Sequence, residues 1–317
     1  MRALSRQLPI PALAVALAIA CAACGSSSSP GTAAASAASS GTFPVTIAAA
    51  NGTVHIPARP TAIISLAPAL TEMLYAVGAG HQVKAVDMYS DYPPQAPRTK
   101  LTGLAPNVEA IVADKPDLVV ESGDTGNLTK RLAAFKIPVL ELPAPAALPG
   151  VYSEFTELGR ATGHVAQAAT ENAAIRGQVA AIVAGLPHRS QPASYYYELD
   201  TTYYSVTSDT FVGHLLGLLG LKSIADAAKG AAAAGGYPQL SAEYILRANP
   251  DYILLADTIC CHQSAATVAA RPGWSSLTAV KDGHIILLND DIASRWGPRI
   301  TDLLQTVETA IAKGGKT

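Results

Sequence analysis

One short motif occurs twice in this chain, once in each half, and it limits the folds that the chain can adopt. Residues 107–119 read NVEAIVADKPDLV and residues 241–253 read SAEYILRANPDYI. In both copies a polar residue caps a short helix, a glutamate lies in the first turn, Pro-Asp ends the helix and a buried strand follows. An acid in the first turn complements the helix dipole, which explains either glutamate alone but not its recurrence. The repeat therefore predicts two equivalent α/β lobes, with Glu109 and Glu243 at equivalent surface positions.

Short apolar runs alternate with segments of helical spacing on both sides of an alanine-rich stretch. Strands are predicted for residues 62–66, 83–88, 117–120, 137–142, 195–199, 253–255 and 285–288. The alanine-rich stretch, residues 165–186, contains no proline and is long enough for a helix of about 33 Å. This alternation is typical of mainly parallel sheets. We therefore expect two Rossmann-like α/β lobes, at residues 46–150 and 188–317, joined by linking helices at 151–187 that include a single long backbone helix.

The N-terminal segment has the order of an export signal. Two arginines precede an apolar run at residues 8–20, which is shorter than the ~20 residues that a membrane-spanning helix needs. Cys21 and Cys24 follow, and then a tract of Ser, Gly and Ala. This order is typical of a bacterial lipoprotein, with a signal peptide at residues 1–24 and a flexible tether at 25–45. Cys24, or alternatively Cys21, would carry the lipid that holds the chain at the outer face of the cell membrane; a plain cleaved signal peptide is the alternative.

Composition excludes several classes of protein. The 317 residues suffice for two domains, and 22 lysines and arginines against 24 acids leave no excess of positive charge for binding nucleic acid. The G-x-S-x-G, P-loop and H-E-x-x-H motifs are all missing from the sequence, so we expect no catalytic residues and no enzyme activity. The seven histidines are scattered, so we expect no resident metal or cofactor, and a free zinc or manganese receptor is a remote alternative.

Two cysteines, Cys260 and Cys261, are adjacent in the sequence. Their spacing does not fit a zinc framework, which needs separated pairs. In an exported protein, adjacent cysteines indicate a vicinal disulfide or two buried thiols, and a soft contact to a ligand is the less favoured reading.

Several of these segments together resemble the family of periplasmic binding proteins for cobalamin and iron chelates. They are residues 63–72, residues 89–94, Glu109 with the Pro-Asp pair after it, and residues 295–300, and the resemblance extends over residues 60–312. It implies a monomeric solute-binding protein of an ABC importer, with its ligand in a cleft between two lobes joined by one rigid helix. It also implies that Glu109 and Glu243 form salt bridges with arginines of the permease dimer, which works with its ATPase subunits.

The resemblance also implies a ligand and its contacts. The implied ligand is a cobalamin-like corrinoid, with contacts at Tyr89 and in the loop formed by Asp291, Ile292, Ala293, Ser294 and Arg295. Trp296, which follows this loop directly, is a further candidate ligand contact. Tyr89 and Arg295 would bound the cleft from opposite lobes. Tyr203 and Tyr204 are further candidates, with ordinary strand packing as the alternative, and Trp274 is expected to be structural.

Two departures from the family pattern keep a second ligand class open. The tryptophan expected shortly before the first glutamate is Leu104 or a neighbour, and the aromatic pair of the second ligand loop is Ile292-Ala293. A ferric siderophore or haem is therefore the alternative to a corrinoid.

Overall fold

The computed structural model describes residues 41–314, which lie within one compact unit of the chain. Both lipidation candidates, Cys21 and Cys24, lie outside the described residues, as does most of the expected tether. A β-hairpin opens the described part, with β1 (Val45–Ala49) paired antiparallel to β2 (Gly52–Ile56). The turn falls at Asn51-Gly52, as this strong turn-forming pair predicts.

Two four-stranded parallel sheets form the cores of the two lobes. The first has the order β4 (Val83–Val86), β3 (Ile63–Ser65), β5 (Leu118–Glu121), β6 (Val139–Glu141). The second has the order β8 (Leu221–Ser223), β7 (Ala193–Glu198), β9 (Tyr252–Leu255), β10 (Ile285–Leu287). Both orders are the same when strands are counted along the chain within each lobe: second, first, third, fourth. The prediction of two equivalent α/β lobes with parallel sheets is confirmed.

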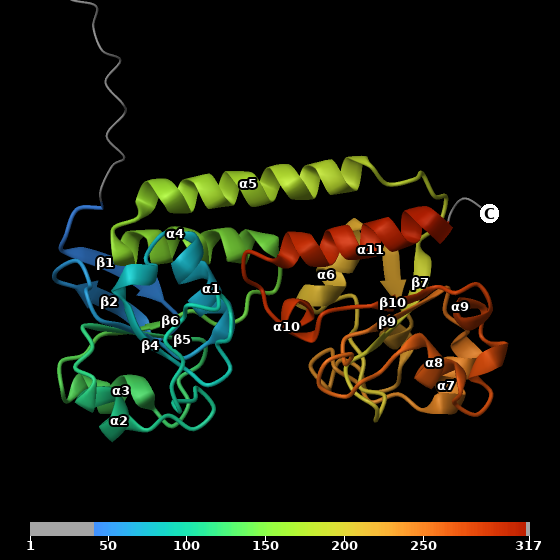
Figure 1. Ribbon diagram of the computed structural model, residues 1–317, viewed down its shortest axis with the longest axis horizontal. Coiled ribbons are helices and arrows are strands. Elements are labelled where there is room, and N and C mark those ends of the chain that lie inside the picture. The colour runs from blue at the N-terminus through green and yellow to red at the C-terminus, as the bar shows by residue number, and fades with distance from the viewer. Residues whose placement is uncertain (1–40, 315–317) are drawn as a thin grey trace, which may run out of the picture. The chain divides into compact units, whose positions relative to one another are not determined.

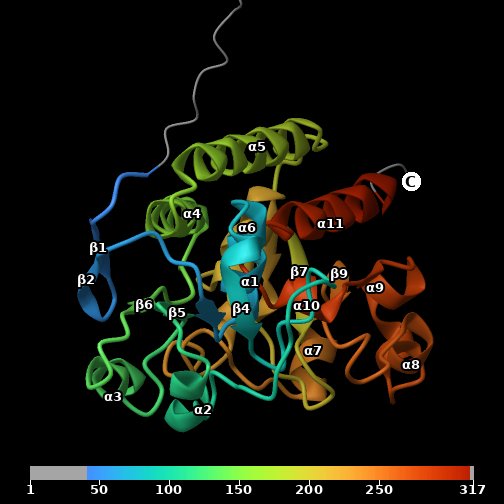
Figure 2. The same cartoon turned by 60° about the vertical axis from the view of Figure 1, so that its left-hand side comes forward.

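Eleven α-helices lie in the described part of the chain. They are α1 (Pro68–Ala76), α2 (Val108–Ala113), α3 (Leu128–Ala133), α4 (Leu148–Thr162), α5 (Val165–Ala184), α6 (Phe211–Leu218), α7 (Ala242–Ala248), α8 (Ala265–Ala269), α9 (Thr278–Lys281), α10 (Asp290–Ala293) and α11 (Ile300–Gly314). The expected long helix is α5, which runs along both lobes (Figure 1). The long helix is not the only helix on this side of the lobes, because α4 and α11 lie between it and the two sheets (Figures 1 and 2).

The repeated Pro-Asp pair has a structural role in both lobes. The Asp117 carboxylate accepts hydrogen bonds from the backbone N–H groups of Thr61 and Ala62, at 2.7 and 3.0 Å. The Asp251 carboxylate accepts equivalent bonds from the N–H and hydroxyl of Ser194, each at 2.7 Å. Each aspartate therefore fastens the start of one strand to the start of its neighbour, β5 to β3 and β9 to β7.

The helices of the repeated motif lie on the same side of the molecule. Both α2 and α7 lie on the side away from α5 in two views (Figures 1 and 2). Asn107 caps α2 by accepting a hydrogen bond from the backbone N–H of Ala110, and Ser241 caps α7 in the same way through Tyr244. No helix among residues 41–314 combines the length and apolarity that crossing a membrane requires.

Candidate functional site

The strand order places a crevice in each lobe. In both sheets the second strand lies on one side of the first strand and the third strand lies on the other side, so the strand order reverses between the first and third strands. In sheets of this kind, ligands bind outside the carboxyl ends of those two strands. In the N-terminal lobe these strands are β3 and β5, and a cavity of about 290 Å³ lies at their ends. Its lining residues are Leu66, Ala67, Pro68, Asp87, Tyr89, Gly103, Leu104, Glu121, Ser122, Gly123 and Thr125.

Apolar side chains are exposed around this cavity. Tyr89 is 49% exposed and Leu104 is 75% exposed, although both carry large apolar surfaces. In the C-terminal lobe, Tyr204 and Ile259 are also exposed, and they follow the carboxyl ends of β7 and β9. Exposed apolar groups gathered at strand ends mark a binding surface rather than a stable solvent face. Sequence reasoning named Tyr89 and Tyr204 but missed Ile259, whose only signal is its position just after a buried strand.

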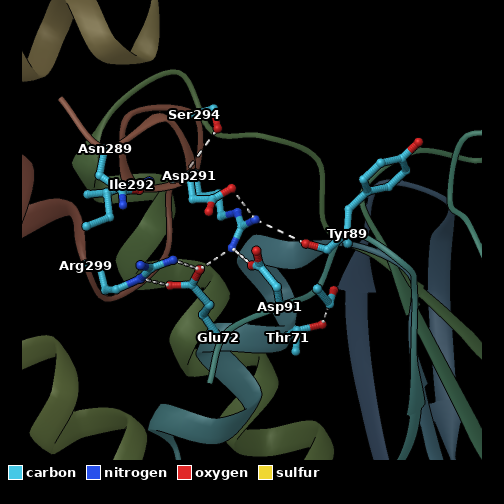
Figure 3. Close-up of polar contacts among 12 residues, drawn as sticks. Thr71, Glu72, Tyr89, Asp91, Asn289, Asp291, Ile292, Ser294 and Arg299 are labelled. Atoms are coloured by element: carbon cyan, nitrogen blue, oxygen red, sulfur yellow. Dashed lines mark hydrogen bonds and ion pairs between the residues drawn. The ribbon is translucent and has the colours of Figure 1, made fainter. Parts of the chain in front are cut away.

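Arg295 joins the two lobes instead of facing the cleft. Its guanidinium donates to Glu72 Oε1 at 3.1 Å, to Asp91 Oδ1 at 2.8 Å and to Asp291 Oδ1 at 2.7 Å (Figure 3). It also donates to the backbone oxygen of Tyr89 at 3.1 Å, and the Tyr89 ring points away from these contacts (Figure 3). The expectation that Tyr89 and Arg295 bound the cleft from opposite lobes is therefore wrong for Arg295, whose side chain is only 9% exposed.

A second arginine completes this junction. Arg299 donates from Nε to Glu72 Oε2 at 2.8 Å and from Nη2 to Glu72 Oε1 at 2.6 Å (Figure 3). The Glu72 side chain has no exposed surface, and the guanidinium of Arg299 lies 4.1 Å above the ring of Tyr92. We call Glu72, Asp91, Asp291, Arg295 and Arg299 the interlobe ion-pair cluster. It holds α1 of the N-terminal lobe to the segment between β10 and α11.

Most of the remaining residues of that predicted ligand loop face the protein, whereas Ser294 is exposed. Ala293 is buried, Ile292 packs on the hydrophobic core, and the Ser294 hydroxyl donates to the backbone oxygen of Asp290 at 2.7 Å. The Trp296 indole N–H donates to Glu154 Oε2 at 2.7 Å. Direct ligand contacts at Ala293, Ile292 and Trp296 are therefore not supported, because their side chains are used in packing the lobes together.

Tyr203 also belongs to the core of its lobe. Its ring stacks on Trp274 with centroids 5.9 Å apart, and Trp274 is fully buried. The Arg271 guanidinium lies 4.6 Å above the Trp274 ring and pairs with buried Glu198 at 2.5 Å. Trp274 is structural, as expected, and for Tyr203 the packing alternative is correct. Tyr204 remains exposed.

The adjacent cysteines lie in the segment after β9 and are both free thiols. Cys260 is exposed, and its backbone N–H donates to Asp290 Oδ2 at 2.7 Å. The possible vicinal disulfide is therefore not formed in this structure. Partial desolvation of the sulfur, hydrogen bonds to Cys261 and Asp290 and the negative charge of Asp290 raise the pKa of the Cys260 thiol.

Three buried carboxyl groups lie near the strand ends or the lobe junction. Burial raises the pKa of Glu121 to about 8, and the negative charges of Asp124 and Glu141 add to the shift. Burial likewise raises the pKa of Glu154 to about 8 and the pKa of Asp257 to about 7. Within the described part of the chain, neither carboxyl oxygen of Glu121 has a hydrogen-bond partner. In residues 41–314, no three His, Cys, Asp or Glu side chains are grouped so as to hold a metal ion.

The two glutamates of the repeated motif are exposed. Glu109 lies in the first turn of α2 and Glu243 in the first turn of α7. Among the described residues neither forms an ion pair, and Arg247, one turn after Glu243, lies instead over the ring of Tyr244. Hydrogen bonds from its own backbone N–H and from the Ser241 hydroxyl lower the pKa of Glu243, which keeps it ionised. Both acids are available to a partner.

The chain is similar to proteins of known name over most of its length. It is 30% identical over 281 residues to a cobalamin-binding protein of Halobacterium salinarum, covering 85% of this chain and 74% of that one. It is 29% identical over 279 residues to YvrC of Bacillus subtilis, an uncharacterized ABC transporter substrate-binding lipoprotein, covering 85% and 86%. Among solved structures, the periplasmic vitamin B12 binding protein BtuF of Vibrio cholerae superposes with a TM-score of 0.67 at 26% identity, covering 81% of this chain and 98% of that one.

A family comparison covers both lobes. Residues 63–292, from β3 through α10, match the family described as periplasmic binding protein. The paired parallel sheets, the long helix that joins them and the similarity to BtuF agree with this match. The chain therefore belongs to the periplasmic binding protein family, whose members bind substrates for ABC importers and are not enzymes.

Proposed function

We propose that this chain captures a cobalamin-like corrinoid in the cleft between its lobes and delivers it to an ABC permease dimer. The similarity to the cobalamin-binding protein and to BtuF supports a corrinoid as the ligand. The geometry supports the same class, because a corrin is a large flat ring system fringed with amides. Exposed aromatic and aliphatic side chains such as Tyr89 and Leu104 can stack on its faces.

The observation that carries this proposal is the pairing of the arginines. Arg295 and Arg299 are held by carboxylates of the interlobe ion-pair cluster, and Arg271 is held by Glu198. A ferric catecholate siderophore carries negative charge, as does haem through its propionates, and such ligands would be recognised by unpaired arginines or lysines. The described lining of the N-terminal cavity holds no Lys, Arg or His, and it includes Asp87 and Glu121. A neutral, amide-bearing ligand suits such a surface better than an anionic chelate.

We place the docking of the permease at Glu109 and Glu243. Each lies in the first turn of its helix, and α2 and α7 lie on the side of the molecule away from α5 (Figure 1). At a docked interface each carboxylate would accept paired hydrogen bonds from an arginine, which is stronger once water is excluded. For the membrane anchor, the lipoprotein name of the Bacillus subtilis relative supports acylation at Cys24 or Cys21.

The ligand assignment is tested by incubating purified protein with cyanocobalamin, a ferric catecholate siderophore or haemin, and measuring absorbance after desalting. Cyanocobalamin should be retained and the two chelates should not. Calorimetry should then show that Tyr89→Ala weakens cyanocobalamin binding by about 1–3 kcal/mol, the usual cost of losing a stacked ring. Phe135→Ala is the control, because Phe135 is an exposed aromatic residue of the same lobe outside the cavity. Retention of haemin or the siderophore alone would reject the corrinoid.

A further inference from the structure

Glu121 is an unusual residue in the wall of the N-terminal cavity. It is the last residue of β5, it is 1% exposed, and neither of its carboxyl oxygens has a hydrogen-bond partner among residues 41–314. Buried polar groups in folded proteins are nearly always hydrogen-bonded, because an unpaired one costs free energy. The position is also specific, since β5 is one of the two strands whose ends form the crevice. Both oxygens are covered by neighbouring groups, so a ligand in this cavity reaches the carboxyl group only when that cover moves aside, and it then meets a group that the protein leaves unsatisfied.

The surroundings of Glu121 keep this group uncharged near neutral pH. Asp124 lies in the turn that follows, Glu141 is its register partner on β6, and Asp87 and Tyr89 line the same cavity from the segment after β4. The central strand β3 contributes no titratable side chain, since its residues are Ile-Ile-Ser. With burial and two neighbouring acids acting in the same direction, the pKa of Glu121 rises to about 8. At neutral pH the group therefore has both an O–H donor and a carbonyl acceptor.

A primary amide matches this pair of groups. Its carbonyl oxygen can accept the O–H, and its N–H can donate to the carbonyl oxygen of the acid, which closes a ring of two hydrogen bonds. An ionised carboxylate of a ligand would instead meet the acidic side chains of Glu121 and Asp87, with no basic residue in the described lining of the cavity to neutralise it. The site thus favours an amide over an acid at the same position of the ligand.

We propose that Glu121 is a specificity-determining residue of the cleft, whose carboxyl group pairs with a side-chain carboxamide of the bound corrinoid. This inference rests on the proposed function and goes further, because it names the group of the ligand that is recognised and the residue that recognises it. It makes binding dependent on pH. Below about pH 8 the acid offers both hydrogen bonds, and above it the carboxylate loses its donor and must be buried as a charge.

The test measures the dissociation constant of cyanocobalamin between pH 6 and pH 9 for the wild type and three variants. For the wild type we expect a constant value up to about pH 7 and a weakening of about tenfold by pH 9, one unit above the pKa. Glu121→Gln keeps a donor and an acceptor but cannot ionise, so its affinity should not change with pH. Glu121→Ala should bind about tenfold more weakly at pH 6. Circular dichroism and thermal melting identify any variant that has not folded.

Glu141→Gln separates an electrostatic role from a structural one. It removes a neighbouring negative charge, so Glu121 should ionise more easily and the midpoint of the pH profile should move to lower pH. Its affinity at pH 6 should equal that of the wild type. A further probe is a cyanocobalamin derivative in which one side-chain amide is hydrolysed to a carboxylate. For the amide that meets Glu121, this derivative should bind at least tenfold more weakly.

The possible results separate this inference from the proposed function. If the wild type binds cyanocobalamin but its affinity does not depend on pH, or if Glu121→Gln shows the same dependence, the role of Glu121 is refuted while the corrinoid assignment stands. An affinity that increases above pH 8 would mean that the ionised carboxylate binds a cationic group, and it would overturn the amide assignment. If cyanocobalamin binds at no pH, the proposed function itself fails.

Discussion

Removing the carboxylate of Glu72 should loosen the junction between the lobes. The Glu72 side chain has no exposed surface and accepts hydrogen bonds from both Arg295 and Arg299, at 2.6 to 3.1 Å. Breaking a buried ion pair by deleting one partner costs roughly 3–5 kcal/mol, because the other charge stays buried without compensation. Arg295 keeps Asp91 and Asp291 as partners, so the cost of Glu72→Ala should lie near the lower end, at about 3 kcal/mol.

Urea denaturation with linear extrapolation gives the free energy of unfolding for this comparison. Arg299→Ala should cost about 2 kcal/mol, since Glu72 keeps Arg295 but the stacking on Tyr92 is lost. Asp209→Asn is the control, because Asp209 is exposed and forms no ion pair within the described part of the chain, and its effect should stay within about 0.5 kcal/mol.

The double variant of Glu72 and Arg299 should cost clearly less than the sum of the two single changes, since both changes remove the same contact. If Glu72→Ala unfolds within 1 kcal/mol of the wild type, the cluster does not hold the lobes together. If instead the two effects add fully, Glu72 and Arg299 act independently and do not stabilise the fold through a shared contact.

Three further predictions follow from the site and the sequence. Burial raises the pKa of Glu154 to about 8, so the folded protein holds this proton more tightly than the unfolded chain does. The stability that the proton supplies is full below the ordinary glutamate pKa and is lost as pH rises to 8, so the melting temperature should fall between pH 6 and 9. Glu154→Gln should raise the free energy of unfolding at pH 9 by about 2 kcal/mol. Glu109→Ala and Glu243→Ala should each leave cyanocobalamin affinity unchanged while reducing uptake by cells, and the double variant should reduce uptake further. Full uptake by the double variant would reject the docking surface. Replacing both Cys21 and Cys24 with serine should release the chain from membranes, as fractionation would show, and complete retention would reject the lipid anchor.

Local patterns in the sequence were enough to predict the fold. Strand and helix periodicity, the Asn51-Gly52 turn and the repeated motif act through neighbouring residues, so they can be read without knowing what packs against them. The same sheet order in both lobes confirms what the motif at Glu109 and Glu243 predicted. Trp274 was also assigned correctly, because its place beside a turn favoured packing over ligand contact. The roles of α4 and α11 beside the long helix were not predicted, since helix spacing says nothing about which helices pack together.

Tertiary contacts decided the site. The loop at Asp291–Arg295 has the polar residues of a ligand contact. Its arginine joins the lobes because it binds the carboxylates of Glu72 and Asp91, which are far away in the sequence. Glu121 was not singled out from the sequence, because a glutamate at a strand end is ordinary until burial and the lack of a partner make it costly. The sequence by itself determined the two lobes and the exposed acids on α2 and α7. Only the folded structure determined which charges are neutralised and which stay available, because electrostatic pairing depends on distances between residues that the chain order leaves far apart.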